Sequence, residues 1–397
     1  MSIIMRLHVD KIAAVTIHSI GFILFLITLP GTLEILFLTT SALLCRAKKR
    51  SQSIPISGKL AVIIPAHNEE KSIGSTIESI KNSDPHASIV VIADNCTDNT
   101  AAIAKEHNAR VIERVNANDK GKPAALQYAF NILLKESFDW FVVVDADSLV
   151  KKNFIEEVLT AFKKGSDAMQ TRYDVRNPTA SLRHRLMNIA FLAFNNLRLM
   201  GRANLGLSCG ILGNGFGLSR QILEIVPFDV KSVVEDLSYH LKIVQAGYKV
   251  DFIPSTSVYG EIPSKGKGVA TQRIRWEGGR LTEICTQIGP LLKKIFLGSY
   301  RLLEPAMELL LLPLAYHVFL LLILLTVFES FIRFYAGISL IAVMYYLAAA
   351  IWLGGGGIKD FAALFFAPFY IIWTLGLFFR LIPKIMKGLK WEKTERQ

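Results

Sequence analysis

Four long apolar stretches set the limits on how this chain can fold. They lie at residues 17–44, 304–328, 335–353 and 361–382. Each approaches the roughly 20 apolar residues that a helix needs to cross a bilayer, so the sequence predicts four transmembrane helices around a polar middle. The second stretch is the weakest of these, because Pro305, Glu308 and Pro313 interrupt its first half. A cleaved signal peptide is the alternative for the first stretch, but its length and its lack of a small-x-small cleavage pattern favour an anchor.

Basic residues gather beside the apolar stretches and bear on membrane topology. They are Arg46, Lys48, Lys49 and Arg50 after the first stretch, and Lys384, Lys387, Lys390 and Lys393 at the end of the chain. Cytoplasmic flanks are rich in Lys and Arg, so both clusters are expected on the cytoplasmic side. Three C-terminal crossings would place the tail outside. Either one of the C-terminal stretches lies in the interface or is re-entrant, or the basic tail lies outside in spite of its charges. The sequence does not decide whether the number of C-terminal crossings is odd or even.

The net charge is explained by this topology. The formal charge is +12, yet no aromatic-basic pattern typical of nucleic-acid binding accompanies it. We therefore expect membrane lipids, and no nucleic acid, among the partners.

Between the apolar ends, short apolar runs alternate with helical patterns. Strands are predicted at 60–65, 88–93, 110–113 and 140–144, with helices at 72–80, 99–107 and 122–135 between them. This alternation is typical of an α/β domain with a mainly parallel sheet, whose ligands bind at the carboxyl ends of the strands. After Asp147 the alternation weakens, and helices are predicted at 181–202, at 234–247 and from 271 to 286.

The strongest local signal is the Asp145-Ala146-Asp147 triplet at the end of an apolar strand. Two carboxylates in such a loop are hard oxygen ligands that suit Mg²⁺ or Mn²⁺, and the metal would bridge to a diphosphate. A pair of loop-capping aspartates is the alternative, so this triplet does not decide the function by itself.

Other polar motifs precede and follow this triplet along the chain, and the first three of them lie at predicted strand ends or in loops. They are Pro65-Ala66-His67-Asn68-Glu69, Asp94-Asn95-Cys96-Thr97-Asp98, Gly121-Lys122, Val234-Glu235-Asp236 and Gln272-Arg273-Ile274-Arg275-Trp276. With the aspartate triplet, this set resembles the membrane-bound family 2 glycosyltransferases, which include exopolysaccharide, cellulose and hyaluronan synthases and ceramide glucosyltransferase-like enzymes. The resemblance covers about residues 60–281. It departs at Val234, where many relatives have Thr.

The resemblance implies a GT-A-like, Rossmann-type α/β fold flanked by transmembrane helices. It divides the chain into an N-terminal transmembrane anchor with a basic cytosolic flank at 1–50 and a cytosolic glycosyltransferase domain at 51–284. An interfacial helix at 285–303 and a C-terminal transmembrane region with a basic tail at 304–397 follow. The later half of the catalytic domain is expected to hold the acceptor site.

The resemblance also implies roles for individual residues on the donor side. Pro65, His67, Glu69 and Asp94 would line the nucleoside pocket, Lys122 would lie near the base or phosphates, and Asp145 and Asp147 would bind the sugar nucleotide and its Mg²⁺ or Mn²⁺.

On the acceptor side, the attacking hydroxyl must lose a proton as the nucleoside diphosphate leaves. Asp236, beside Glu235, is the expected general base. Gln272, Arg273 and Arg275 are expected near the diphosphate, and Trp276 offers an aromatic face to the acceptor. A membrane-proximal amphipathic anchor is the alternative for Arg275 and Trp276.

The glycine-rich segment 213–217 does not predict a dinucleotide site, because its third glycine and the following acidic residue are missing. Asn214 is expected near the acceptor, and a simple turn is an equal alternative.

These observations predict an inverting enzyme that transfers a hexose or N-acetylhexosamine from a nucleotide-sugar, with a UDP-sugar as the expected donor. The acceptor would be a growing extracellular polysaccharide, with export through a partner subunit or homo-oligomer. The alternative is a glycolipid synthase that adds one sugar to a lipid. An inactive membrane scaffold is a distant third, since the acidic residues are intact. We expect a multi-pass protein of the bacterial cytoplasmic membrane with its catalytic domain in the cytosol.

Overall fold

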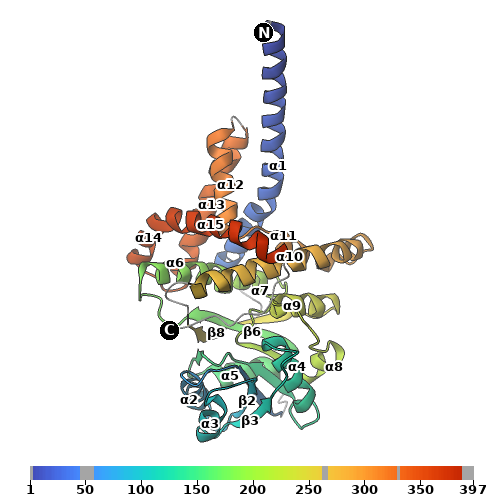
Figure 1. Cartoon of the computed structure of the whole chain (residues 1–397), viewed down its shortest axis with the longest axis vertical. Coiled ribbons are helices and arrows are strands. Elements are labelled where there is room, and N and C mark those ends of the chain that lie inside the picture. Colours follow the sequence, from blue (N-terminus) through green and yellow to red (C-terminus); the bar gives the residue numbers. More distant parts are fainter. Residues whose placement is uncertain (1–2, 45–57, 262–266, 329–330, 387–397) are drawn as a thin grey trace.

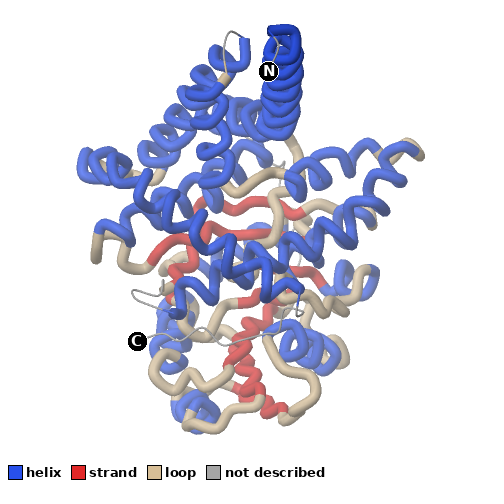
Figure 2. Tube along the Cα trace, turned by 45° about the horizontal axis from the view of Figure 1, so that its top comes forward, coloured by secondary structure: helices blue, strands red, loops and turns tan. Residues whose placement is uncertain are grey.

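The computed structural model describes residues 3–44, 58–261, 267–328 and 331–386. An α/β domain forms one end of the molecule (Figure 1), and the strands gather there beneath a layer of helices (Figure 2). The predicted basic residues Arg46 to Arg50, Lys387, Lys390 and Lys393 lie outside the described residues, as does the side chain of Lys384. The charge-based topology therefore stays a prediction.

A single mixed sheet of eight strands forms the centre of the α/β domain, in the order β3-β2-β1-β4-β7-β6-β8-β5. Its strands are β1 (Leu60–Ala66), β2 (Ser88–Asp94), β3 (Arg110–Arg114), β4 (Trp140–Val143), β5 (Leu149–Val150), β6 (Ala168–Val175), β7 (Phe216–Ser219) and β8 (Val250–Gly260).

Helices cover both faces of the sheet because successive side chains of a strand point to opposite faces. In β1, Ala61 and Ile63 pack into one core and Val62 and Ile64 into the other. The first core contains residues of α4 (Lys122–Leu133), α8 (Arg220–Ile225) and α9 (Glu235–Gln245). The second contains residues of α2 (Ile73–Ser83), α3 (Thr100–Glu106) and α5 (Phe154–Lys163).

The first half of the domain confirms the predicted alternation of strands and helices. β1 to β4 are parallel to one another, and their bounds differ from the predicted ones by one residue at most. The second half differs, because β7 inserts between β4 and β6 and runs antiparallel to both. The loop before β7 turns tightly, and a Cβ added at Gly215, where φ is +69°, would lie 2.4 Å from Thr171 Oγ1. Sequence periodicity carries no information about such a long-range insertion.

The predicted helix at 181–202 is present, but its middle is a π-helical turn. It consists of α6 (Leu182–Phe191), the π-helix η1 (Leu192–Leu197) and α7 (Arg198–Asn204). The boundary expected at residue 285 does not separate two elements. α10 (Lys267–Phe296) passes through it unbroken, and η2 (Tyr300–Leu302) follows.

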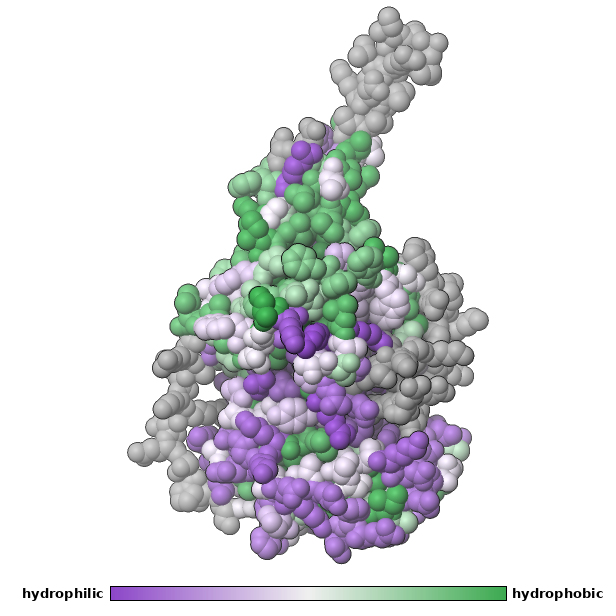
Figure 3. All heavy atoms as spheres, turned by 90° about the vertical axis from the view of Figure 1, so that its left-hand side faces the viewer, coloured by the Kyte–Doolittle hydropathy of each residue, from purple (hydrophilic) through white to green (hydrophobic). Residues whose placement is uncertain are grey.

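Three helices are long and apolar enough to cross a membrane within the described ranges, at Val15–Leu44, Phe331–Leu353 and Ile358–Leu377. They belong to α1 (Ile3–Leu44), to α13 (Phe331–Leu353), and to the run of α14 (Ile358–Ala363), η3 (Leu364–Phe366) and α15 (Ala367–Met386). Apolar side chains cover this end of the molecule on the face shown in Figure 3, and polar side chains dominate the α/β domain. In Figure 1, α15 runs across the direction of α1.

The weak second stretch is bent. α11 (Leu303–Leu310) and α12 (Leu314–Val327) meet at an angle of 76°, as a broken span or a re-entrant segment. Arg280 of α10 donates hydrogen bonds to the backbone oxygens of Glu308 and Leu311, each at 2.5 Å. Carbonyls at a helix end have no partner within the helix, so this arginine stabilises the bend.

A buried ion cluster joins α1 to the α/β domain. Glu34 of α1 lies 2.6 Å from Arg198 and 3.0 Å from Arg202, both on α7. Arg202, only 1% exposed, also contacts Glu304 and Glu308 of α11, each at 2.8 Å. Three elements that are far apart in sequence thus meet at one arginine.

Arg202→Met is expected to destabilise the protein by on the order of 3–5 kcal/mol, because the largely buried Glu304 and Glu308 lose their nearest cation. Thermal unfolding in detergent, followed by intrinsic fluorescence, should show a clearly lower midpoint. Arg301→Met is the matched control, since Arg301 is exposed. Equal midpoints for both variants would contradict the proposed role of the cluster.

Candidate active site

One pocket, with a volume of about 200 Å³, lies at the carboxyl ends of β1, β2 and β4. It brings together most of the residues singled out from the sequence. Its lining includes Pro65, His67, Glu69, Asp94, Lys122, Asp145, Asp147, Glu235, Asp236, Gln272, Arg275 and Trp276.

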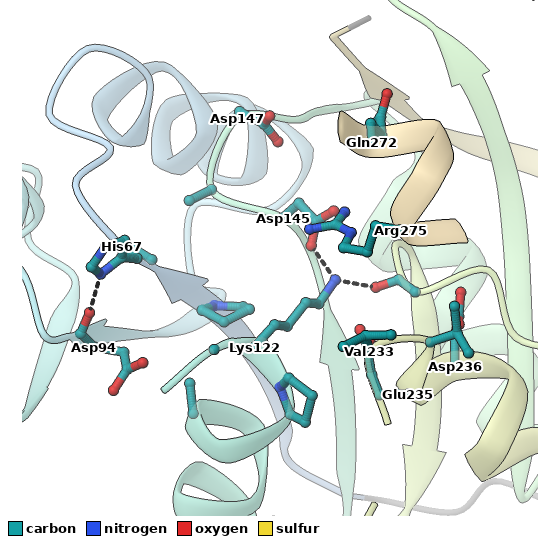
Figure 4. Close-up of a pocket in the computed structure, with 18 of the residues that line it drawn as sticks. His67, Asp94, Lys122, Asp145, Asp147, Val233, Glu235, Asp236, Gln272 and Arg275 are labelled. Carbon is teal, nitrogen blue, oxygen red and sulfur yellow. Dashed lines mark hydrogen bonds and ion pairs between the residues drawn. The ribbon is translucent and has the colours of Figure 1, made fainter. Parts of the chain in front are cut away.

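The β2 side of the pocket is braced by a buried ion pair. His67 Nδ1 lies 2.7 Å from the backbone oxygen of Asp94 (Figure 4). The Asp94 carboxylate pairs with Arg114 at 2.6 Å, and Arg114 also binds Asp119 at 2.8 Å. Sequence reasoning missed Arg114. The available signal was a basic residue at the carboxyl end of a predicted parallel strand.

Lys122 lies at the centre of the pocket and connects two of its walls. Its ammonium pairs with Asp145 and donates a hydrogen bond to the backbone oxygen of Gly213 at 2.6 Å (Figure 4). Burial lowers the pKa of Lys122, but the carboxylates of Asp145, Glu235 and Asp236 outweigh burial and raise it overall. The lysine therefore stays positively charged and holds the Asp145 loop.

Glu235 and Asp236 begin helix α9 and form a pair of neighbouring carboxyl groups. Burial, followed by the charge of Asp236, raises the pKa of Glu235 to about 7, and burial also raises the pKa of Asp236. Asp236 Oδ1 accepts a hydrogen bond from the backbone N–H of Leu237 at 2.8 Å. A carboxyl pair that releases its proton near neutral pH is suited to general base catalysis.

The donor atoms of the pocket fit a divalent cation that is shared with a substrate. Asp145 and Asp147 both line it, and carboxylate oxygens are the ligands that Mg²⁺ and Mn²⁺ prefer. Among the described residues, no three His, Cys, Asp or Glu side chains gather into a metal site. A cation here would need further ligands from phosphates and water, as Mg²⁺ commonly does.

Helix α10 supplies the remaining wall. Arg275 reaches from it toward Asp145 (Figure 4), and its buried Nε has no hydrogen-bond partner among the described residues. A guanidinium with a spare donor beside a carboxylate and a lysine suits a phosphate ligand. Trp276 is 39% exposed and lines the same pocket.

Comparison with known proteins identifies the class of enzyme. A family model described as "Glycosyltransferase like family 2" matches residues 57–279, more than half of the chain. The protein belongs to this family. Most of the polar motifs of the matched region line one pocket, and the chain is a glycosyltransferase.

Two curated relatives resemble this glycosyltransferase over their shared region. The probable glycosyltransferase YdaM of Bacillus subtilis (strain 168) is 28% identical over 233 residues, which are 56% of this chain and 55% of the relative. The poly-beta-1,6-N-acetyl-D-glucosamine synthase of Staphylococcus epidermidis is 22% identical over 253 residues, 62% of this chain and 60% of that protein. The chain thus spans little more than half the length of these relatives.

A solved structure shares the fold over most of the chain. The mannosyltransferase PcManGT from Pyrobaculum calidifontis, in complex with GDP-Man and Mn²⁺, has a TM-score of 0.51 at 17% identity. The match covers 84% of this chain and 97% of that one. It supports the GT-A-like fold expected from the sequence.

The structure does not bring Arg273 into the pocket of this glycosyltransferase, although the sequence placed it near the diphosphate. Its side chain binds Glu277 of the same helix at 2.7 Å and the hydroxyl of Tyr370 on α15 at 2.6 Å. On a helix, residues two positions apart point in different directions, so Arg273 and Arg275 cannot both face the pocket.

Asn214 also differs from the expectation of an acceptor contact. It is buried and lies outside the lining of the pocket. Its Oδ1 accepts from the backbone N–H of Asp145 at 3.1 Å, and its Nδ2 donates to Ser148 Oγ at 2.9 Å. Asn214 therefore positions the aspartate loop. Tyr173 and Leu212 line the pocket without having been singled out from the sequence, and Gly213, the first residue of the glycine-rich segment, lines it as well.

Proposed function

We propose that this glycosyltransferase moves a hexose or N-acetylhexosamine from a UDP-sugar onto a hydroxyl of a membrane-associated acceptor, with inversion at the anomeric carbon. One observation carries the proposal. Lys122, Asp145, Asp147 and Arg275, which suit a metal-bound diphosphate, share a pocket with the carboxyl group of Asp236, which suits a hydroxyl acceptor.

The reaction follows from this arrangement. The acceptor oxygen attacks the anomeric carbon and its proton passes to the Asp236 carboxylate. The new glycosidic C–O bond forms as the bond to the diphosphate oxygen breaks, and UDP leaves with the electron pair. A single displacement inverts the anomeric configuration. Burial raises the pKa of Asp236, which favours proton uptake there.

A divalent cation is part of the proposal. Asp147, with Asp145, would hold it, and when bound it would stabilise the negative charge of the leaving diphosphate. Lys122 and Arg275 add fixed positive charge on the same side. The Mn²⁺ named for the mannosyltransferase PcManGT supports this choice, and Mg²⁺ is the other cation that the donor set fits.

Two acceptors are consistent with this chemistry. The name of the relative from Staphylococcus epidermidis, a poly-beta-1,6-N-acetyl-D-glucosamine synthase, supports a growing extracellular polysaccharide that a homo-oligomer or partner subunit exports. An apolar cavity lined in part by Asp236 supports the glycolipid alternative.

The helix arrangement supports a specific topology in the cytoplasmic membrane. We infer that α1, α12 and α13 cross the bilayer and that α15, which runs across them in Figure 1, lies in the interface. α12 has 14 residues, so local thinning of the bilayer would accommodate it. With two C-terminal crossings, the chain returns to the cytosolic side, where the catalytic domain lies. The basic tail is then cytosolic, as its charges predict.

The function is tested with purified protein in nanodiscs that contain Mn²⁺ or Mg²⁺. UDP-, GDP- and other nucleotide-sugars are offered, and nucleotide release, product size and anomeric configuration by NMR are followed. Release of UDP from one UDP-sugar with an inverted product is expected. Retention of configuration, or turnover with GDP-sugars alone, would contradict the proposal.

Asp236→Asn is expected to lower kcat by about 10²–10⁴-fold, because a positioned general base contributes that much to proton transfer. UDP affinity, measured by calorimetry, should change little. Asp229→Asn is the matched control, because Asp229 forms an exposed pair with Lys242 outside the pocket. Wild-type kcat in the Asp236 variant would remove this residue from the mechanism.

The pH dependence of kcat/KM should report the carboxyl pair. The pKa of Glu235 is raised to about 7 and that of Asp236 is raised as well, so the pair holds a proton below this pH. Because the base must be deprotonated, the rate should rise with pH and level off above about 7, with apparent pKa values that belong to the pair. In Glu235→Gln the midpoint should move to lower pH. A flat profile between pH 5 and pH 7 is the result that this account does not allow.

Asp147→Asn is expected to abolish the gain in UDP affinity that Mn²⁺ provides, because an amide is a weaker ligand for a hard cation than a carboxylate. Calorimetric titration of UDP with and without Mn²⁺ measures this gain directly. Asp84→Asn, at the end of α2 and outside the pocket, is the control. An unchanged effect of Mn²⁺ in Asp147→Asn would show that the cation binds elsewhere.

A further inference from the structure

An apolar cavity lies between the α/β domain and the helices at the membrane end of the molecule. Its volume is about 490 Å³, within the range of about 300–1,000 Å³ typical of ligand sites. α6, η1 and α7 form one wall, and α12, α13 and α15 form the other. Most lining side chains are apolar, among them Leu186, Phe194, Val318, Val343, Leu347 and Ile371.

The cavity adjoins the donor pocket, because one set of residues lines both spaces. These are Tyr173, Leu212, Val234, Asp236, Gln272 and Trp276. Asp236 is the one carboxylate that lines both spaces within the described part of the chain, whereas Glu235 lines the donor pocket alone. A molecule whose hydroxyl reaches Asp236 can therefore keep the rest of its length in the apolar cavity.

The cations that line this cavity already have partners. Arg273 binds Glu277 and Tyr370, and Arg280 binds carbonyl oxygens of α11 and the bend after it. Arg198 and Arg202 belong to the ion cluster around Glu34. A phosphate on the acceptor would compete with these pairs, so the cavity favours an uncharged occupant.

His240, a further polar residue of the wall, is also neutral and paired. Burial lowers the pKa of His240 to about 4, so it is uncharged at neutral pH, and its Nε2 lies 2.8 Å from Ser208 Oγ. A glycan in the cavity would bury hydroxyl groups against apolar walls, and each hydroxyl left unpaired would weaken its binding. A hydrocarbon chain has no such cost, and its burial is favourable.

We propose that this cavity binds the hydrocarbon chain of a neutral, hydroxyl-bearing lipid and presents its hydroxyl to Asp236. The inference rests on the proposed function and specifies its acceptor class. Val318, Val343 and Leu347 belong to α12 and α13, the helices inferred to cross the bilayer, so the lipid enters from the membrane side. Phe194 of η1, which is 41% exposed, lies at the rim of this path.

With this acceptor, every bond that breaks in the transfer step is matched by a bond that forms. The lipid O–H bond breaks and its proton moves to the Asp236 carboxylate. The lipid oxygen forms the bond to the anomeric carbon as the sugar–phosphate C–O bond breaks, and UDP departs with that electron pair. The products are a neutral glycolipid and UDP, and the sugar is added once because a glycosylated headgroup no longer presents the lipid hydroxyl.

The test uses full-length protein in nanodiscs that contain a diacylglycerol with a photoreactive diazirine in its acyl chain. Irradiation and peptide mass spectrometry locate the crosslinks. A second arm supplies UDP-sugars with a radioactive sugar and separates organic-soluble from water-soluble products. Ala190→Phe and Ala367→Phe fill the cavity from opposite walls, and Ala362→Phe places the same side chain at an exposed position outside it.

Crosslinks should fall on α6, η1 and α13, and labelled glycolipid should appear in the organic phase. Both signals should drop at least about tenfold in the two cavity variants and stay unchanged in Ala362→Phe, because a phenyl ring occupies the space of the chain. UDP affinity in the cavity variants, measured separately, shows that they are folded.

Two results would overturn the inference while leaving the proposed function in place. One is a water-soluble polymer as the main product. The other is equal crosslinking in wild type and both cavity variants with UDP release intact. Crosslinking in the cavity without release of UDP from any UDP-sugar would instead overturn the proposed function.

Discussion

The arrangement of the whole molecule depends on the buried contact between Glu34 of α1 and the two arginines of α7. Arg202 extends this contact to Glu304 and Glu308 of α11, so a membrane helix, the catalytic domain and the bent segment are held by one charge cluster. A buried ion pair adds little to the net free energy of unfolding. Removal of one partner nevertheless destabilises the protein strongly, because the other charge stays buried without a partner. The cluster therefore fixes the position of the membrane helices relative to the catalytic pocket. α7 also approaches α1 closely, since a Cβ added at Gly201 would lie 2.4 Å from the backbone oxygen of Leu38.

This fixed position gives the active site its two compartments. The donor pocket lies at the carboxyl edge of the sheet, as expected for a parallel α/β domain. The apolar cavity exists because α12, α13 and α15 cover the α6–α7 surface without filling it. Asp236 lines both spaces, and α10 connects them through Arg275 on the donor side and Arg273 on the cavity side. The proposed chemistry would thus take place where a water-soluble donor and a membrane-borne acceptor can meet.

The sequence predicted those parts that follow from local patterns. Sequence patterns predicted the alternation of strands and helices from β1 to β4 and the family. They also predicted the grouping of Asp94, Lys122 and Asp145, because each of these motifs ends a regular strand or begins a helix. The reversed strand β7, the partner of Glu34 and the ion pair of Asp94 with Arg114 depend on contacts between distant segments, which periodicity does not reveal. Arg273 and Asn214 were assigned to ligands because their motifs contain polar residues, whereas the structure uses one to bind α15 and the other to hold the Asp145 loop.

The central claim is that donor and acceptor spaces meet at Asp236. An electron cryomicroscopy structure of the protein in nanodiscs with UDP, Mn²⁺ and diacylglycerol tests it most directly. The account predicts the diphosphate between Asp147 and Arg275, with chain-like density in the apolar cavity that ends at Asp236. Nucleotide bound away from these residues, or a cavity closed by side chains with the lipid elsewhere, would contradict it.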